Sequence, residues 1–382
     1  TYIEGFGYHV SFLMFCMALI NLTTEYSKTL HRISVPFFFK QVIQKSLIII
    51  LVLVYFLKYI TFNQFILILD TILLVVALIH IAYLIKLGAL KLSWQKPFES
   101  FKKHLEFQTY NLFLIISGGS MLIIENLDIL MLGVFSGIEK TGIYSISFFI
   151  AAVIDMPRRA IQQISSPVLA ESFKLKDFKK VDSIYKKTAI NTFFAGVVLF
   201  LVIWINADNI FKIMPNGDIF KEAKIIILII GFGRLFDISF GANSYILSLS
   251  KHYKINSLFI TFLVLIAFSL NYFLIPKYGI EGAAYATTVS LVIFNLLKHW
   301  FVLKKFKLTP FTTDYHKLLI MSIVCLILNY FSPEFENPYL DVLIRTFSFA
   351  LLFIILYIAL KVKTDLVTKA ISKINSINVF RK

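Results

Sequence analysis

The chain has 382 residues, of which 58% are hydrophobic and only 16% are charged. A soluble domain carries roughly a quarter charged residues. Here the apolar residues form long runs, such as 47–57, 65–85 (interrupted by Asp70 and His80) and 347–360. Because a run of about 20 apolar residues crosses the hydrocarbon of a bilayer, this pattern excludes a soluble globular protein. The sequence predicts an all-α polytopic membrane protein.

The net charge of +16 is high enough to suggest a nucleic-acid-binding protein. The Lys residues, however, lie in short segments between apolar runs rather than on one continuous face, as expected of cytoplasmic loops. We therefore expect no nucleic-acid partner. Cys16 and Cys325 both lie inside apolar runs. They fit neither a disulfide framework nor a metal-ligand spacing, and we expect both to pack in the core.

The apolar runs predict eleven spans, in chain order. Their bounds are 8–24, 46–60, 62–85, 111–134, 143–165, 188–207, 223–249, 255–275, 280–303, 317–331 and 340–360. The second is short, at the low end of the length that a bilayer accepts. The longest connection on the base-rich side, 86–110, contains Trp94 and a Phe- and Lys-rich stretch. These features suit an interfacial helix between two lobes.

The basic residues fix the expected orientation. One set of alternate connections, with the C-terminal tail, holds 27 Lys and Arg residues, whereas the other holds six: Lys58, Lys140, Lys212, Lys221, Lys224 and Lys277. By the positive-inside rule the first set is cytoplasmic, and so is the C-terminus. With eleven spans Thr1 then lies outside, and a chain that starts in the cytoplasm needs an odd number of further spans before it.

Charged residues inside the spans occur at helical spacing. Asp155 precedes Arg158 and Arg159 by three and four residues, and Arg234 precedes Asp237 by three. Glu125 and Asp128 form an acidic pair with the same spacing. One interpretation is that these residues are ion pairs that join helices. The other is a water-filled cavity, whose bases bind an anionic substrate and whose acids balance or couple it.

The remaining bases and the helix breakers have simpler interpretations. Lys298 and Arg345 are expected to extend to the two interfaces of the membrane. Pro157, beside the Arg pair, removes a helical hydrogen bond, and Gly231 and Gly233 allow bending. These three residues are candidate hinges of a transporter that opens alternately to two sides. Close packing of small residues explains the glycines equally well.

We find no Walker A loop, no paired Cys motif, no His-Glu-x-x-His sequence and no loop Asp-x-Asp. The sequence therefore predicts a protein that is not an enzyme and that has no cofactor, no metal site and no catalytic residues.

Several short motifs in the second half resemble the polysaccharide and O-antigen flippases of the multidrug/oligosaccharidyl-lipid/polysaccharide exporter superfamily. They begin with Asp128 and the Leu-Met-Leu-Gly run that ends at Gly133, and continue through Gly142-Ile143-Tyr144-Ser145 and Pro157. The others are Ser166-Pro167-Val168-Leu169-Ala170, Gly241-Ala242-Asn243, and a long stretch from Asn271 through Pro276, Gly279 and Gly282 to Thr287.

The resemblance implies two six-helix lobes followed by two extra spans, with both ends cytoplasmic. Residues 1–85 would then be the second half of the first lobe, 86–110 the inter-lobe connection, 111–308 the second lobe, and 309–382 two extra spans and a basic tail. Three spans would precede Thr1, which is the odd number that the charges require.

Function also follows from the resemblance. It implies flipping of an undecaprenyl-pyrophosphate-linked oligosaccharide across the bacterial cytoplasmic membrane, for surface polysaccharide biosynthesis. Arg158, Arg159 and Arg234 would bind this substrate, while Asp155, Asp237, Glu125 and Asp128 would balance charge or couple transport. The lipid bilayer, a polysaccharide polymerase and other assembly proteins are the further partners implied.

Three alternatives stay open. A multidrug and toxic compound extrusion transporter has the same fold and exports organic cations from a more acidic cavity. A membrane glycosyltransferase, polymerase or ligase would act on the same lipid, although such enzymes need a larger outer loop than any predicted here. A scaffold without transport activity is the third.

Overall fold

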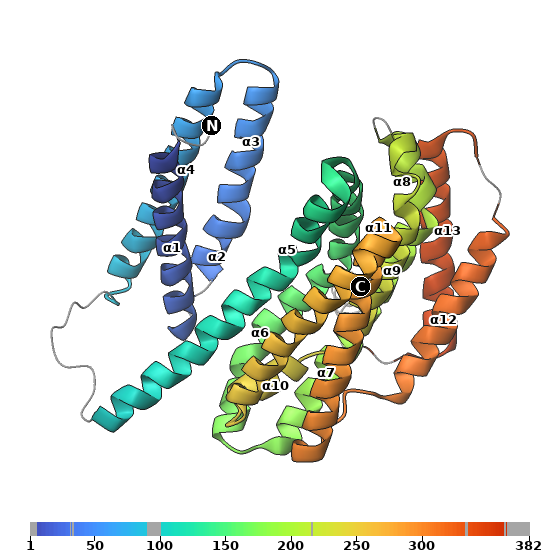
Figure 1. Ribbon diagram of the computed structural model, residues 1–382. Coiled ribbons are helices and arrows are strands. Elements are labelled where there is room, and N and C mark those ends of the chain that lie inside the picture. Colours follow the sequence, from blue (N-terminus) through green and yellow to red (C-terminus); the bar gives the residue numbers. More distant parts are fainter. Residues whose placement is uncertain are drawn as a thin grey trace, which may run out of the picture. The chain divides into compact units, whose positions relative to one another are not determined.

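The computed structural model describes residues 6–30, 32, 34–89, 101–214, 217–332, 335–362 and 364. The regular structure of these residues is helical throughout and contains no strand (Figure 1). The chain divides into two compact units, residues 1–99 and 100–382. The predicted all-α polytopic membrane fold is confirmed. The predicted interfacial segment lies largely outside the described residues, and so do most of the basic C-terminal residues.

Unit 1 contains three long helical segments: α1 (Gly7–Thr29), the continuous run of α2 (Ser34–Phe38), η1 (Phe39–Ile43) and α3 (Gln44–Phe56), and α4 (Phe62–Lys86). The second segment begins twelve residues before the predicted span 46–60, so it is not short: 34–56 gives 23 residues. Thr61 caps α4 through a reciprocal hydrogen-bonded arrangement with Gln64. Asp70 has a partner that the sequence did not identify, because the Nδ1 atom of His9 lies 2.6 Å from its Oδ2.

Unit 2 contains the remaining elements. They are α5 (Phe101–Ala152), η2 (Val153–Asp155), α6 (Met156–Lys174), α7 (Phe178–Ile205), α8 (Ala207–Ile213), η3 (Gly217–Phe220), α9 (Ala223–Ser239), α10 (Asn243–Leu249), α11 (Tyr253–Phe306), α12 (Thr313–Tyr330) and α13 (Pro338–Ala359). Its core consists of buried aliphatic and aromatic side chains, mainly of α5, α7, α9 and α11, with further contributions from α6, α10, α12 and α13.

Two of these elements are hairpins rather than straight helices. α5 breaks at Gly137 and α11 at Gly279, where φ is +82° and +57° respectively, a region that glycine enters without a steric penalty. Tyr144 donates a hydrogen bond to Asp128 over 2.7 Å, although residues 16 apart in a straight helix lie about 24 Å apart. The two halves of α5 therefore fold back on each other.

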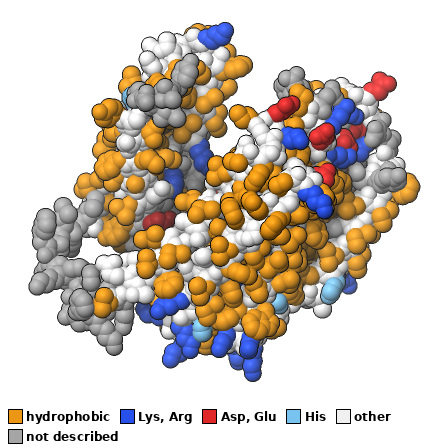
Figure 2. All heavy atoms as spheres, viewed as in Figure 1, with side chains coloured by type: hydrophobic (Ala, Val, Ile, Leu, Met, Phe, Trp, Pro, Cys, Tyr) orange, Lys and Arg blue, Asp and Glu red, His pale blue; other side chains and the backbone are white. Residues whose placement is uncertain are grey.

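The observed segments correspond to the eleven predicted spans. Seven described helices are long and apolar enough to cross a membrane, or eight if α9 and α10, bent by 49°, are taken as one span. The hairpin α11 contains two predicted spans, and α5 together with η2 and α6 contains another two. The remaining predicted span is α12, whose first five residues include Asp314, His316 and Lys317. In unit 2 hydrophobic side chains cover the middle, bases gather at one end, and both charge signs occur at the other (Figure 2).

Candidate functional site

A cavity of about 500 Å³ lies inside unit 2 between α5, α6, α9, α10 and α11. Such a volume falls in the range of small-molecule sites. Its apolar lining includes Phe113, Phe148 and Phe294. Its polar lining includes Glu125, Arg158, Gln162, Arg234, Asp237, Ser244, Ser248, Asn256, Thr287, Ser290 and Lys298. Four of the residues predicted to bind the substrate or to balance its charge therefore line the same cavity: Glu125, Arg158, Arg234 and Asp237.

Arg158 joins two elements through a pair of carboxylates. Its Nε lies 2.6 Å from Oδ1 of Asp155, three residues earlier, and its Nη1 lies 2.7 Å from Oδ2 of Asp237 in α9. Pro157 is in the first turn of α6, where a missing N–H costs little. The 3-10 turn η2 and this proline place Arg158 at the start of α6, facing α9. Two carboxylates neutralise its single charge.

Arg159 is not part of the cavity lining. Its Nε approaches Oδ2 of Asp155 at 3.4 Å, and its side chain is 69% exposed. The predicted pairing of Asp155 with both arginines is thus observed, with Arg158 as the closer partner. The structure does not bring Arg159 together with the other predicted substrate-binding residues.

Arg234 is a cationic group of the cavity that has no carboxylate partner among the described residues. The expected ion pair with Asp237, three residues later, does not form, because Asp237 accepts from Arg158 instead. The guanidinium of Arg234 lies 5.1 Å from the ring centroid of Phe148, and its Nε is buried without a hydrogen-bond partner. Its charge therefore stays available to an anion in the cavity.

Lys298 does not extend to the membrane interface, so that prediction was wrong. Its side chain is 1% exposed, and its Nζ donates to Oγ of Ser244 at 2.9 Å and to Oδ1 of Asn243 at 3.3 Å. The ammonium also lies 3.8 Å from the ring centroid of Phe294. Because α10 packs against α11, polar partners reach Lys298 inside the unit. Arg345, expected at the other interface, is ion-paired with Asp341 at 2.7 Å.

A chain of hydrogen bonds links these charges. Asn295 donates to Asp237 at 2.8 Å, and Asn243 donates to Asn295 at 3.3 Å. Lys298 then donates to the same Asn243 side chain. Sequence reasoning missed this connection between α9, α10 and α11. A detectable signal was present, since Asn295 and Lys298 are two polar residues at i and i+3 within an otherwise apolar run.

The two predicted acidic residues of α5 have different environments. Glu125 is exposed and lines the cavity. Asp128 is buried and accepts hydrogen bonds from Tyr144 and Asn271, each at 2.7 Å, and from Thr287. These donors come from the second half of α5 and from both halves of α11. Asp128 therefore holds the two hairpins together, while Thr287 also faces the cavity.

The candidate hinge glycines lie at close contacts within α9. A Cβ atom on Gly231 would approach the Phe200 ring to 2.8 Å, and one on Gly233 would approach Oγ1 of Thr288 to 2.8 Å. Both positions are buried in a regular helix. The geometry thus favours the packing interpretation of the glycines, and a hinge at these two residues or at Pro157 remains a prediction.

Comparisons with known proteins agree with this architecture. The MatE family profile matches residues 114–273. A segment of 170 residues, 43% of the chain, is 27% identical to the "Capsular polysaccharide biosynthesis protein CapF" of Staphylococcus aureus, and it covers 41% of the length of that protein. A solved structure of "Lipid II flippase MurJ, inward closed conformation" aligns with a TM-score of 0.63 at 15% identity, over 91% of this chain and 73% of that one.

The match to the MatE profile covers the motifs from Asp128 to Gly241-Ala242-Asn243 and the first residues of the stretch that begins at Asn271. The structural likeness extends over 91% of the chain. The structural likeness shows that the chain has the fold of a multi-pass membrane flippase. The predicted resemblance to the polysaccharide flippases of the multidrug/oligosaccharidyl-lipid/polysaccharide exporter superfamily is confirmed.

Proposed function

We propose that the chain is a transporter, and not an enzyme, that flips an undecaprenyl-pyrophosphate-linked oligosaccharide from the cytoplasmic to the outer leaflet of the bacterial cytoplasmic membrane. Its loops 174–187, 249–254 and 303–317 would face the cytoplasm. The resemblance to flippases supports the transport activity, and the name of the Staphylococcus aureus relative supports a role in surface polysaccharide biosynthesis.

One observation carries the proposal: the cavity contains two bases, Arg234 and Lys298, that no described carboxylate neutralises by direct contact. An uncompensated charge inside a membrane protein costs several kcal/mol, so such residues mark binding sites and ion pathways. A pyrophosphate supplies at least two negative charges and several acceptor oxygens. The guanidinium of Arg234 offers forked donors to them, and Lys298 offers a point charge.

Arg158 has a different part in this proposal. Because Asp155 and Asp237 already hold it, an incoming phosphate must compete with carboxylates for its donors. The exchange would release α9 from α6 when the substrate binds. Arg234 and Lys298 would therefore provide most of the affinity, and Arg158 would couple binding to the movement of the helices. Gln162 and Ser244 add neutral hydrogen-bonding groups to the same wall of the cavity.

The experiment is complementation of a flippase-deficient strain, with polysaccharide export and membrane protein level measured together. We expect Arg234→Gln and Lys298→Gln to abolish export while the protein level is maintained, and Arg234→Lys to retain part of it. Arg159→Gln is the matched control, because this arginine is exposed outside the cavity. Full export by well-expressed variants at both positions would contradict the proposal.

The cation-exporting alternative rests on Glu125, which faces the same cavity without an ion-pair partner among the described residues. It makes the opposite prediction. Glu125→Gln would abolish resistance to organic cations in a drug-sensitive strain, and Arg234→Gln would leave that resistance intact or increase it. Testing both variants in both strains separates the two functions.

A further inference from the structure

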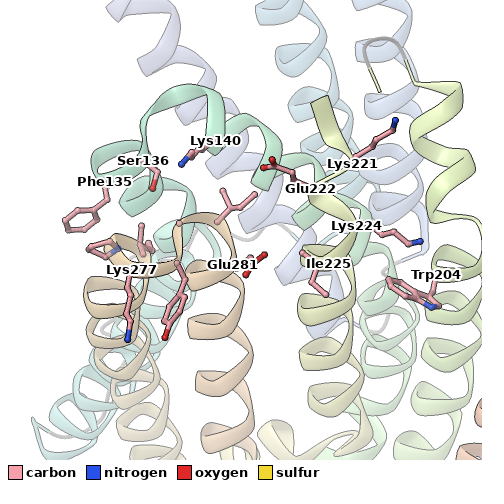
Figure 3. A pocket seen from close by; sticks show the side chains of 15 residues that line it. Phe135, Ser136, Lys140, Trp204, Lys221, Glu222, Lys224, Ile225, Lys277 and Glu281 are labelled. Carbon is pink, nitrogen blue, oxygen red and sulfur yellow. The ribbon is translucent and has the colours of Figure 1, made fainter. Parts of the chain in front are cut away.

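A second and larger hollow lies at the end of unit 2 that is opposite to the base-rich loops. Its volume is about 1020 Å³. The turns at Gly137 and Gly279 meet there with the end of α7 and the start of α9 (Figure 3). We call it the turn hollow, and its charged and aromatic lining consists of Phe135, Lys140, Trp204, Lys221, Glu222, Lys224, Lys277, Tyr278 and Glu281.

The turn hollow collects most of the bases at this end of the unit. Of the six basic residues that the sequence assigns to the sparsely charged side, four line it. Lys224 is paired with Asp208 at 2.6 Å, whereas no described carboxylate is bonded to Lys140 or Lys277. Glu222 and Glu281 stand between Lys140 and the Lys221–Lys224 pair in Figure 3. Donors and acceptors therefore alternate across the hollow, with bases in excess.

Aromatic rings lie beside these charges. The ammonium of Lys224 is 5.4 Å from the ring centroid of Trp204, and that of Lys277 is 5.1 Å from the ring centroid of Tyr278. A ring of this kind presents a flat apolar face with a polar edge. Sugar rings have the complementary surface, since C–H groups on one face pack on aromatic rings while hydroxyls at the edge bond to carboxylates and ammonium groups. An isolated phosphate has no apolar face to pack on the aromatic rings, and a fatty chain has no polar groups to bond to the charged side chains.

We infer that the turn hollow binds an oligosaccharide that carries carboxylate groups, and that it holds the sugar part of the transported lipid after this part has left the central cavity. The identity of the ligand as a transported sugar rests on the proposed function. Its chemistry rests on the hollow itself: Lys140 and Lys277 bind the acidic groups, Glu222 and Glu281 accept from hydroxyls, and Trp204 and Tyr278 pack on the rings. The volume accommodates several sugar units.

The test measures binding of pentagalacturonate to the full chain, purified in detergent, by isothermal titration calorimetry. Fully methyl-esterified pentagalacturonate has the same rings without the charge, and inorganic phosphate supplies charge without rings. We expect pentagalacturonate to bind best, the ester to bind more weakly and phosphate not to compete. Lys140→Gln and Lys277→Gln should each weaken binding of the acidic probe about two- to fivefold, as for exposed charge pairs. Tyr278→Ala should weaken binding of both saccharides.

Lys212→Gln is the matched control, because Lys212 is exposed in α8 and is absent from the lining. Equal competition by phosphate, or pentagalacturonate binding that none of the three hollow variants weakens, would overturn the inference. Arg234→Gln separates it from the proposed function. That variant should lose export but bind pentagalacturonate like the unaltered chain, so failure of either idea is visible independently of the other.

Discussion

Arg158 in α6 and Asp237 in α9, 79 positions apart, form a 2.7 Å ion pair inside the membrane region of unit 2. Asp155 holds the same guanidinium from the other side at 2.6 Å. The sequence spacing predicted the pair of Arg158 with Asp155, which is observed, and a pair of Arg234 with Asp237, which is not. Because Asp237 pairs with Arg158 and not with Arg234, the ion pair links α6 to α9. The guanidinium of Arg234 is then available to bind an anionic substrate.

The first prediction concerns this ion pair. Asp237→Asn should lower stability, because Arg158 loses one of its two negatively charged partners and a single amide oxygen replaces the two carboxylate oxygens that accept from Arg158 and Asn295. Removal of one partner of a buried pair costs about 3 to 5 kcal/mol, and since Asp155 remains we expect about 1 to 3 kcal/mol. Thermal unfolding in detergent measures the loss. Asp182→Asn, which removes a half-exposed pair with Lys186, is the control and should change stability by less than about 1 kcal/mol. Equal effects of the two substitutions would show that the buried Arg158–Asp237 pair stabilises the fold no more than a half-exposed pair does.

The second prediction separates structure from transport at Lys298. A buried ammonium without a carboxylate partner costs free energy that an apolar side chain of similar length does not. We therefore expect Lys298→Met to unfold at the same or a higher temperature than the unaltered chain, yet to export no polysaccharide. The comparison of melting temperature with export in the same membranes checks this. A variant that loses both together would assign Lys298 a structural role only.

The fold was largely predictable from the sequence, because hydropathy and charge act locally. The apolar runs gave the spans, and the glycines at 137 and 279 lie between predicted spans at the observed turns. The second span was predicted too short, since Lys40 and Lys45 interrupt its apolar run while η1 and α3 continue the helix.

The site was predictable only in part. Charged residues inside apolar runs were recognised as candidate site residues. This criterion identified Glu125, Arg158, Arg234 and Asp237. Their partners were not recognised, because spacing along one helix reports only neighbours on that helix. Lys298 lies five residues from the end of its predicted span, where a lysine usually extends to the interface. Only the packing of α10 against α11 supplies the Asn243 and Ser244 partners that retain it inside.

The third prediction concerns the glycines of α9. Gly233→Ala should destabilise unit 2, because the new methyl group would lie 3.1 Å from the backbone Cα atom of Thr288 and 2.8 Å from its hydroxyl. Overpacking of this kind costs about 1 to 3 kcal/mol. Gly142→Ala is the control, since no atom lies within 4 Å of the added Cβ there. Helix propensity then predicts a gain of up to about 1 kcal/mol. Thermal unfolding and transport of both variants, measured together, distinguish a packing role from a hinge role. A variant of a hinge glycine would lose transport without a large loss of stability.

The last prediction tests the orientation on which both proposals depend. Lys180, Lys251 and Lys305 are exposed in base-rich loops, whereas Lys140 and Glu336 are exposed at sparsely charged connections. Because short basic loops are retained in the cytoplasm, a cysteine at any of the first three positions should resist a membrane-impermeant maleimide added to intact cells, while Lys140→Cys and Glu336→Cys should react. The background is a variant without Cys16 and Cys325, both buried. Permeabilised cells are the control, since all five cysteines should then react. The reverse pattern in intact cells would place the turn hollow in the cytoplasm, where a sugar that has already crossed the membrane does not occur.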